Sequence, residues 1–179
     1  MSVGGPACEV PTSGVAVTPL GYLAVCGRGG VAERALLGFA ARAAAEAWTA
    51  EVGGGPRSEA DWAGPLEAMT AYARGESFGL DDVPRREPDG LSEFAHAVRA
   101  VVAAIPYGMT RTYGEVAELA GRPRAARAAG TVMARNPLTL LMPCHRVVPA
   151  GGKPGKYNSP GGVGVKLKLL AMEAAAGRP

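Results

Sequence analysis

Residues 138–148 read Leu138-Thr139-Leu140-Leu141-Met142-Pro143-Cys144-His145-Arg146-Val147-Val148 and carry the strongest signals in the chain. The opening run, residues 138–142, is mostly apolar and too short for a helix of its own, so it predicts a buried strand. Pro143 has no N–H to offer to a sheet, and the strand should end there. Cys144 is therefore expected at the exit of a strand, held by apolar walls, with His145 beside it.

Cys144 and His145 form a candidate nucleophile and base. A cysteine attacks as the thiolate, which needs a base or hydrogen-bond donors nearby. Because His145 cannot readily meet the sulfur of its immediate neighbour head-on, we expect a bridging water or the loop geometry to connect them. The alternative is a core cysteine with a chance histidine beside it, and the pair alone favours that alternative.

The composition indicates a globular chain. A chain of 179 residues, 47% hydrophobic and 20% charged, can form one good core or two small ones. No apolar run reaches the roughly 18 residues of a membrane span, and the N-terminus lacks the pattern of a secretory signal. The three cysteines, Cys8, Cys26 and Cys144, predict no disulfide framework, so a reduced, cytoplasmic setting is expected.

The charge is unevenly distributed along the chain. Residues 1–90 hold 7 basic and 12 acidic residues, a net of −5, whereas residues 91–179 hold 12 basic and 4 acidic residues, a net of +8. A half-chain this basic is typical of a protein that binds a polyanion. A merely solvated basic surface is the alternative, and charge alone does not decide between them.

The first half of the chain predicts two strands followed by two helices. Residues 15–17 and 22–25 are apolar runs on either side of a Thr-Pro-Leu-Gly turn. The alanine-rich residues 32–50 predict a helix, which the following glycines end. Residues 62–74 predict a second helix with one apolar face directed to the core.

Residues 79–90 predict a linker between two domains. The segment is polar and contains prolines, and the change in charge falls at its end. We therefore expect an N-terminal domain over residues 1–85 and a second domain over residues 90–179.

The second domain begins with three predicted helices. Residues 92–105 carry an apolar stripe at helical spacing, and Thr112 and Glu115 have the spacing of a capping box that opens a helix through residue 120. Pro123 suits the first turn of a further helix, residues 123–135. Two short helices joined by a tight turn are typical of a helix-turn-helix, and an ordinary αα-hairpin fits the pattern equally well.

The last of these three helices is almost free of side-chain bulk. Small residues surround a single arginine, Arg127, in the sequence Ala125-Ala126-Arg127-Ala128-Ala129-Gly130. A slim helix can approach a minor groove closely, and one planar cation can then enter a base stack. The alternative is a helix packed tightly against its own core with Arg127 at the surface.

The closing segment, residues 163–176, predicts an apolar helix with Glu173 near its end. A carboxylate near a helix C-terminus is locally unfavourable because of the helix dipole. Glu173 is therefore expected either to be exposed or to serve a partner such as a histidine.

These motifs resemble those of the O6-alkylguanine-DNA alkyltransferases. The likeness rests on Asn136-Pro137 followed by Pro143-Cys144-His145-Arg146-Val147, and it extends from about Thr18 to Glu173. The resemblance implies an α+β fold: a small α/β N-terminal domain and a mostly helical C-terminal domain with a winged-helix-like helix-turn-helix. It implies direct DNA repair, in which an alkyl group moves once from O6 of guanine, and possibly O4 of thymine, to cysteine.

The resemblance also implies roles for individual residues. Cys144 would accept the alkyl group, His145 would act as base through a water, and Glu173 would orient His145. Asn136 would brace the turn, and Tyr113 would help rotate the nucleotide and protonate the leaving guanine. On the DNA-binding side it implies Arg127 in the space of the flipped base, with contacts from Arg124, Ala125, Ala126, Ala128, Gly130 and Arg135. A loop over residues 148–159 would cover the base through Val148, Tyr157, Asn158 and Ser159.

The chain departs from the family pattern at two places. Arg99 stands where an aromatic residue is usual, and the loop following Gly155 differs from the usual Gly-Tyr-x-Gly-Gly. Some members bind zinc in the N-terminal domain, but no histidine here precedes His96, so no metal is predicted.

The expected partner is double-stranded DNA carrying O6-alkylguanine, bound by a monomer away from any membrane and without a cofactor. Two alternatives remain open. One is a protein that binds lesions without alkyl transfer, against which Cys144 argues, and the other is a homologue diverted to another alkylated substrate.

Overall fold

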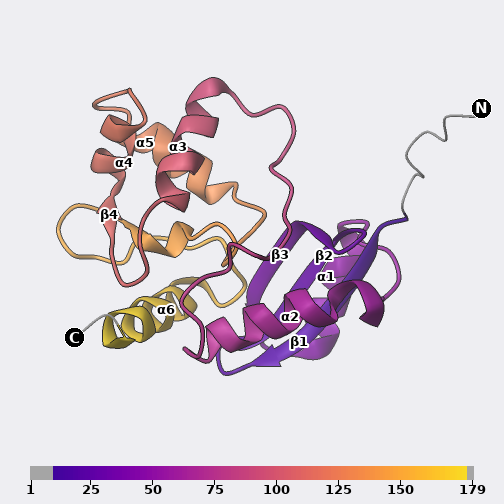
Figure 1. Ribbon diagram of the computed structural model, residues 1–179. Helices are drawn as coiled ribbons and strands as arrows, with labels where there is room; N and C mark the ends of the chain where they lie inside the picture. Colours follow the sequence, from indigo (N-terminus) through magenta and orange to yellow (C-terminus); the bar gives the residue numbers. More distant parts are fainter. Residues whose placement is uncertain (1–9, 177–179) are drawn as a thin grey trace, which may run out of the picture.

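Three antiparallel strands form the first part of the molecule. In the computed structural model, which describes residues 10–176, β1 (Thr12–Thr18), β2 (Gly21–Arg28) and β3 (Val31–Phe39) pair in the order β1-β2-β3 (Figure 1). The turn between β1 and β2 is closed by Thr18, whose hydroxyl donates to the Gly21 carbonyl oxygen. Both strands expected from the sequence are therefore confirmed.

The prediction of a helix over residues 32–50 is wrong for the first half of that segment. Residues 31–39 form β3, and only Arg42–Glu51 forms a helix, α1. Alanine and leucine favour a helix by only tenths of a kcal/mol, roughly, over residues that favour strands. Pairing with β2 outweighs that preference, together with burial of Ala35 and Leu37 in the main core and of Phe39 in the smaller cluster.

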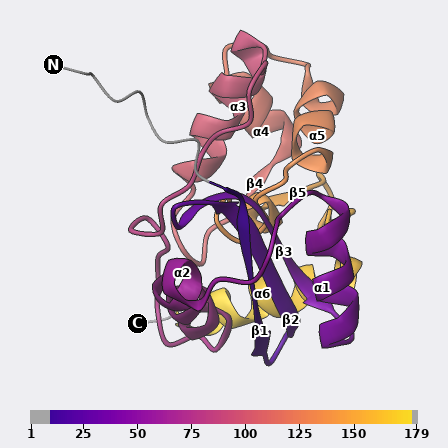
Figure 2. The same ribbon diagram turned by 90° about the vertical axis from the view of Figure 1, so that its right-hand side faces the viewer.

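Helices α1 and α2 (Glu59–Ala73) cover opposite faces of this sheet (Figure 2). The α2 helix starts three residues earlier than expected, because the Ser58 side chain caps it by accepting from the Asp61 N–H. The core beneath α2 contains Leu23, Val25, Leu37, Trp62, Met69 and Tyr72. The smaller cluster beneath α1 contains Val15, Ala24, Phe39 and Ala45.

Residues 79–90 contain no helix or strand and run beside β3. The Ala32 N–H donates to the Pro84 carbonyl oxygen at 2.8 Å, and the Arg86 N–H donates to the Ala32 carbonyl oxygen at 2.8 Å. One hydrophobic cluster joins Leu23 of the sheet to Leu169 near the C-terminus. The division into domains at this segment stays a prediction.

The helices after the linker follow their capping signals. Ser92 caps α3 (Glu93–Ala103), and Thr112 and Glu115 form a complete capping box at the start of α4 (Tyr113–Leu119). Gly121 ends α4 with a φ of 78° in the left-handed region, which glycine adopts without strain.

The next helix, α5 (Ala126–Ala134), begins later than the sequence pattern indicated. Arg124 has a φ of 73°, so the chain is still turning after Pro123 and no helix can start there. Helices α4 and α5 pack against each other across this turn. Their assignment as a helix-turn-helix stays a prediction.

The strand expected over residues 138–142 is wrong. Leu138 and Thr139 make only isolated bridges, and Leu140 has a φ of 76° inside a turn that the Met142 N–H closes on the Leu138 carbonyl oxygen at 2.8 Å. The segment is anchored to β3, because the Thr139 N–H donates to the Ala35 carbonyl oxygen at 2.9 Å. The apolar run correctly indicates that the segment is buried, but a buried turn and a buried strand have the same apolar pattern.

The next elements hold Cys144, His145 and Arg146 in place. Cys144–Arg146 is a short 3₁₀ helix, η1, and β5 (Val147–Val148) pairs in parallel with β4 (Arg111–Thr112). Helix α6 (Gly162–Ala176) closes the fold and contacts both η1 and β3. Within residues 10–176, no helix is both long and apolar enough to cross a membrane.

Candidate active site

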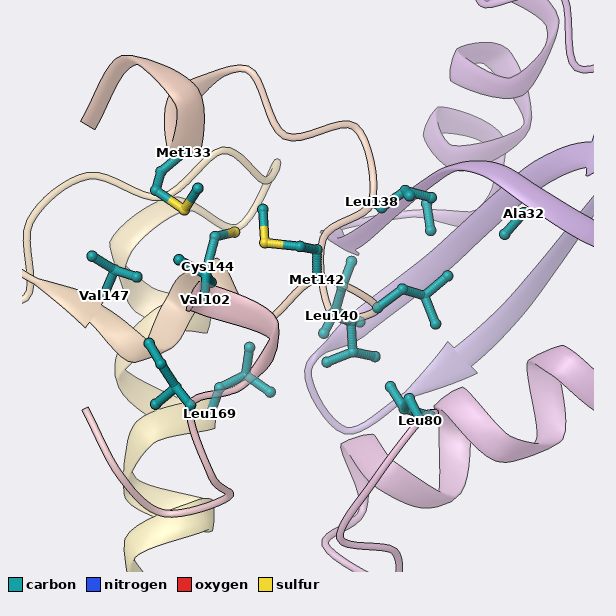
Figure 3. Packing of buried hydrophobic residues seen from close by; sticks show 14 of the residues in the cluster. Ala32, Leu80, Val102, Met133, Leu138, Leu140, Met142, Cys144, Val147 and Leu169 are labelled. Carbon is teal, nitrogen blue, oxygen red and sulfur yellow. The ribbon is translucent and has the colours of Figure 1, made fainter. Parts of the chain in front are cut away.

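Cys144 lies at the first position of η1, with 4% of its surface exposed. Figure 3 shows its side chain among Met133 of α5, Met142 and Val102 of α3. A cavity of about 390 Å³ reaches the cysteine. Its walls are Tyr113, Gly130, Met133, Ala134, Cys144, Pro149, Gly155, Lys156, Tyr157 and Asn158.

Asn136 is the polar group that contacts the sulfur. Its Nδ2 donates to Cys144 Sγ at 3.2 Å and to the Met142 carbonyl oxygen at 3.2 Å, while Oδ1 accepts from the Leu138 N–H at 3.1 Å. Burial raises the pKa of the Cys144 thiol, and the hydrogen bond from Asn136 opposes this shift. The buried sulfur is therefore a thiol at neutral pH and needs a base to become the nucleophile.

His145 has the properties of that base. It is fully buried, its Nε2 lies 2.6 Å from Glu173 Oε1, and its Nδ1 has no hydrogen-bond partner among the described residues. Burial lowers the pKa of His145 against the opposing effect of Glu173, so the ring is neutral. Since a carboxylate can only accept, the Nε2 atom carries the proton and Nδ1 is free to accept one.

Glu173 gathers donors from several parts of the chain. Arg146 Nε donates to Oε2 at 2.9 Å, the Gly108 N–H donates to Oε2 at 3.0 Å, and the Tyr72 hydroxyl donates to Oε1. Burial alone would raise the pKa of Glu173, but the hydrogen bonds from His145, Arg146 and Tyr72 lower it to about 2. The carboxylate is therefore ionised and held in one orientation behind the imidazole.

Sequence reasoning missed three residues at this site. The sequence places Tyr72 only in the predicted helix of residues 62–74, and it assigns no role to Arg146 or Lys166. Lys166 is buried on α6, and its Nζ donates to the Val147 carbonyl oxygen at 2.6 Å. Burial lowers the pKa of Lys166 to about 8. A usable signal existed, because Lys166 and Glu173 stand on the same apolar face of α6 seven positions apart, where charged residues need partners.

The structure brings part of the expected covering loop to the cysteine. Tyr157 and Asn158 line the cavity, the Tyr157 ring lies edge-on to His145, and Asn158 Nδ2 donates to the Asn136 carbonyl oxygen at 3.0 Å. Val148 lies in β5 and Ser159 donates to the Leu37 carbonyl oxygen of β3, so neither borders the cavity. Tyr113, the first residue of α4, is half-buried and also lines the cavity.

The bulk-free helix lies next to this cavity. Gly130 of α5 lines the cavity, whereas Arg127 and Ala128 are exposed. The other residues expected to contact DNA divide into two groups: Arg124 and Arg135 are exposed, and Ala125 and Ala126 are half-buried at the start of the helix. Of the residues expected at the DNA, Gly130 lines the cavity at Cys144, whereas Ala128 and Arg135 line a separate cavity.

The sheet with α1 and α2 on its faces and the helical second half form an α+β fold, in which a buried cysteine is followed by a neutral imidazole paired with a carboxylate. Residues 93–175 match the family model described as 6-O-methylguanine DNA methyltransferase, DNA binding domain. The chain is 34% identical over 158 residues to a methylated-DNA–protein-cysteine methyltransferase of Mycobacterium bovis, covering 87% of this chain and 88% of that protein. The chain therefore belongs to the methylated-DNA–protein-cysteine methyltransferase family.

Two further relatives agree with this assignment. The protein of the same name from Mycolicibacterium paratuberculosis is 43% identical over 113 residues, which cover 63% of this chain and 65% of that relative, slightly less than two thirds of its length. The crystal structure of Mycobacterium tuberculosis OGT in complex with DNA superposes with a TM-score of 0.73 at 31% identity, over 92% of this chain and 93% of that one.

Proposed function

We propose that this chain repairs O6-alkylguanine in duplex DNA by moving the alkyl group onto Cys144, once per molecule. The observation that carries the proposal is that Cys144 lines a cavity of about 390 Å³ and is followed in the chain by a neutral imidazole that pairs with Glu173. A thiol in such a setting can be activated and can meet an alkyl group that enters the cavity. The names of the relatives, methylated-DNA–protein-cysteine methyltransferases, support the substrate.

The transfer is a displacement at carbon. A water between the thiol and the free Nδ1 of His145 passes the proton from sulfur to the imidazole, and Glu173 stabilises the imidazolium. The thiolate then attacks the alkyl carbon, so that a sulfur–carbon bond forms while the bond from that carbon to O6 of guanine breaks. Tyr113 borders the cavity and is the proposed donor of the proton that the leaving guanine takes up. No step proposed here removes the alkyl group from the thioether, so each molecule acts once.

Delivery of the base relies on α5. The slim helix is proposed to dock in the minor groove, with Ala125, Ala126, Ala128 and Gly130 at the DNA, and with Arg124 and Arg135 near phosphates. The exposed Arg127 is proposed to occupy the space left by the extruded nucleotide. Tyr157 and Asn158 then cover the base from the loop.

The proposed setting follows from the chemistry. The alkyl group arrives on the DNA, so no small cofactor is required. A thiol nucleophile needs a reducing compartment, which favours the cytoplasm. A monomer suffices, because the residues proposed for the reaction come from one chain.

Intact mass measurement after incubation with O6-methylguanine duplex tests the proposal. We expect a gain of one methyl group on Cys144, absent in Cys144→Ser and retained in Cys26→Ala, which removes the other described cysteine. Tight binding to the alkylated duplex without any mass gain would indicate a lesion binder. Neither binding nor mass gain would indicate a homologue with another alkylated substrate.

A further inference from the structure

Arg99 is a buried cation close to the active site, at one of the two places where the sequence departs from the family pattern. It lies on the core-facing side of α3 with 4% of its surface exposed. Burying a guanidinium is costly unless it is paired and hydrogen-bonded. The position of Arg99 therefore calls for identified partners.

The first partner is Asn136. Arg99 Nη1 donates to Asn136 Oδ1 at 3.3 Å, and Asn136 Nδ2 donates to Cys144 Sγ at 3.2 Å. Each donor in this chain of hydrogen bonds points toward the sulfur, and such chains strengthen their members by polarisation. A cation on the oxygen of an amide also forces the amide NH₂ group to the other side, where the cysteine lies.

The second partner is Glu87 from the linker. Its carboxylate forms an ion pair with Arg99 Nε, while Arg99 Nη2 is buried without a hydrogen-bond partner among the described residues. Glu87 is about half exposed, and it borders a cavity of about 900 Å³ between β3, the linker, α3 and α5. Glu87 of the linker is therefore connected to Cys144 through the side chains of Arg99 and Asn136.

We propose that Arg99 is a positioning residue for alkyl transfer: it holds the Asn136 amide toward the sulfur of Cys144 and favours the thiolate, and Glu87 holds Arg99. The proposal rests on the function proposed above for Cys144. The reactivity of Cys144 then depends on the linker as well, because the ion pair of Glu87 with Arg99 connects the linker to the site.

Arg99 is one of several titratable groups near Cys144, and the others limit how far Arg99 alone can change the pKa of the thiol. Lys166 of α6 and Arg99 favour the thiolate by their charge, and both lower the pKa of Cys144 against its burial. Burial raises the pKa of the Tyr113 and Tyr157 hydroxyls, and a negative charge on Cys144 raises both further. His145 is neutral and receives the proton.

The test measures the pH dependence of Cys144 modification by iodoacetamide, followed by peptide mass, together with the alkyl-transfer rate on O6-methylguanine duplex. In Arg99→Met, which removes the charge next to an existing cavity, we expect the midpoint of the iodoacetamide profile to rise by about one pH unit. Alkyl transfer at neutral pH should then fall about tenfold. Arg99→Lys should recover part of the shift, because it keeps the charge and loses the planar fork.

Two further variants keep the test decisive. Arg86→Met removes a linker arginine that pairs with Asp89 and does not contact Asn136, and we expect the wild-type profile. Glu87→Gln leaves the Arg99 charge uncompensated, so the midpoint should fall, and this variant decides the matter if Arg99→Met does not fold.

A folded Arg99→Met protein with the wild-type midpoint, or an unchanged midpoint in Glu87→Gln, would overturn the inference. A wild-type protein that reacts with iodoacetamide but transfers no alkyl group would instead overturn the proposed function, and the profiles would still decide the role of Arg99.

Discussion

Arg146 and Glu173 form a buried ion pair, with Arg146 Nε 2.9 Å from Glu173 Oε2, and the other carboxylate oxygen lies 2.6 Å from His145 Nε2. The arginine also donates from Nη1 to the Ile105 carbonyl oxygen at 2.7 Å and from Nη2 to the Tyr72 hydroxyl at 2.9 Å. One carboxylate thus serves the stability of the fold and the orientation of the proposed base.

Glu173→Gln should therefore impair both properties. Removing one partner of a buried ion pair costs about 3–5 kcal/mol, and loss of the oriented base should slow alkyl transfer by roughly a hundredfold. Urea unfolding and single-turnover kinetics measure the two effects. Glu118→Gln, on the exposed face of α4, is the matched control. A variant with wild-type kinetics would contradict the role given to Glu173.

Acid should destabilise the wild-type protein through the same carboxylate. The pKa of Glu173 is about 2 in the folded state against an ordinary value of 4.5, so its contribution is fully present above pH 4.5. That contribution is lost as the pH falls toward about 2, because the unfolded chain binds the proton first. Unfolding free energies across this window should decline less in Glu173→Gln than in the wild type. Parallel curves for the two proteins would rule out this source of acid sensitivity.

Asn136→Asp should separate the two roles of Asn136, which accepts from the Leu138 N–H and donates to Cys144 Sγ. An aspartate keeps the oxygen that accepts from the Leu138 N–H but replaces the Nδ2 donor with an oxygen facing Cys144. A negative charge there disfavours the thiolate, so we expect iodoacetamide modification of Cys144 at neutral pH to slow by about tenfold or more. Thermal unfolding shows whether the fold is retained. Equal reactivity in a folded variant would refute the contact between Asn136 and the thiolate.

Arg127→Ala should weaken DNA binding without changing the chemistry of the cysteine. Arg127 is exposed on α5 and lies outside the cavity lining. We expect weaker binding to O6-methylguanine duplex, with a salt slope of log affinity that falls by about one if the arginine also neutralises a phosphate. Arg74→Ala, an exposed arginine of the N-terminal half paired with Glu76, is the control. Slower iodoacetamide modification in Arg127→Ala would count against a role confined to DNA.

Lys166→Met should change how stability depends on alkaline pH. The pKa of Lys166 is about 8 in the folded state against an ordinary value of 10.5, so the unfolded chain binds the proton more tightly between these values. Lys166 therefore adds stability as the pH rises through this window, and the variant should lack that gain. Denaturant titrations at several pH values measure the difference, with the exposed Lys168→Met as the control. The same pH dependence of stability in both variants would contradict a lowered pKa of Lys166.

Local capping signals predicted the bounds of α4, whereas Pro123 placed the start of α5 three residues too early. The capping box of Thr112 and Glu115 and the glycine at position 121 mark the ends of α4, because caps and left-handed residues act within a few positions of the helix that they end. Composition and the short apolar run gave wrong predictions for residues 31–39 and 138–142. There, pairing with β2 and β3 decided the conformation, and neither partner can be read from the local pattern.

The sequence by itself predicted Cys144 as a candidate nucleophile, His145 as its candidate base and the small-residue helix, because these features lie within short runs of the chain. Only the tertiary structure decided which groups surround them. Tyr72 meets Glu173 across 101 positions, His145 meets it across 28, and Arg99 meets Asn136 across 37. Contacts over such separations depend on how helices and sheet pack together, and burial at those contacts sets the charge state of each group.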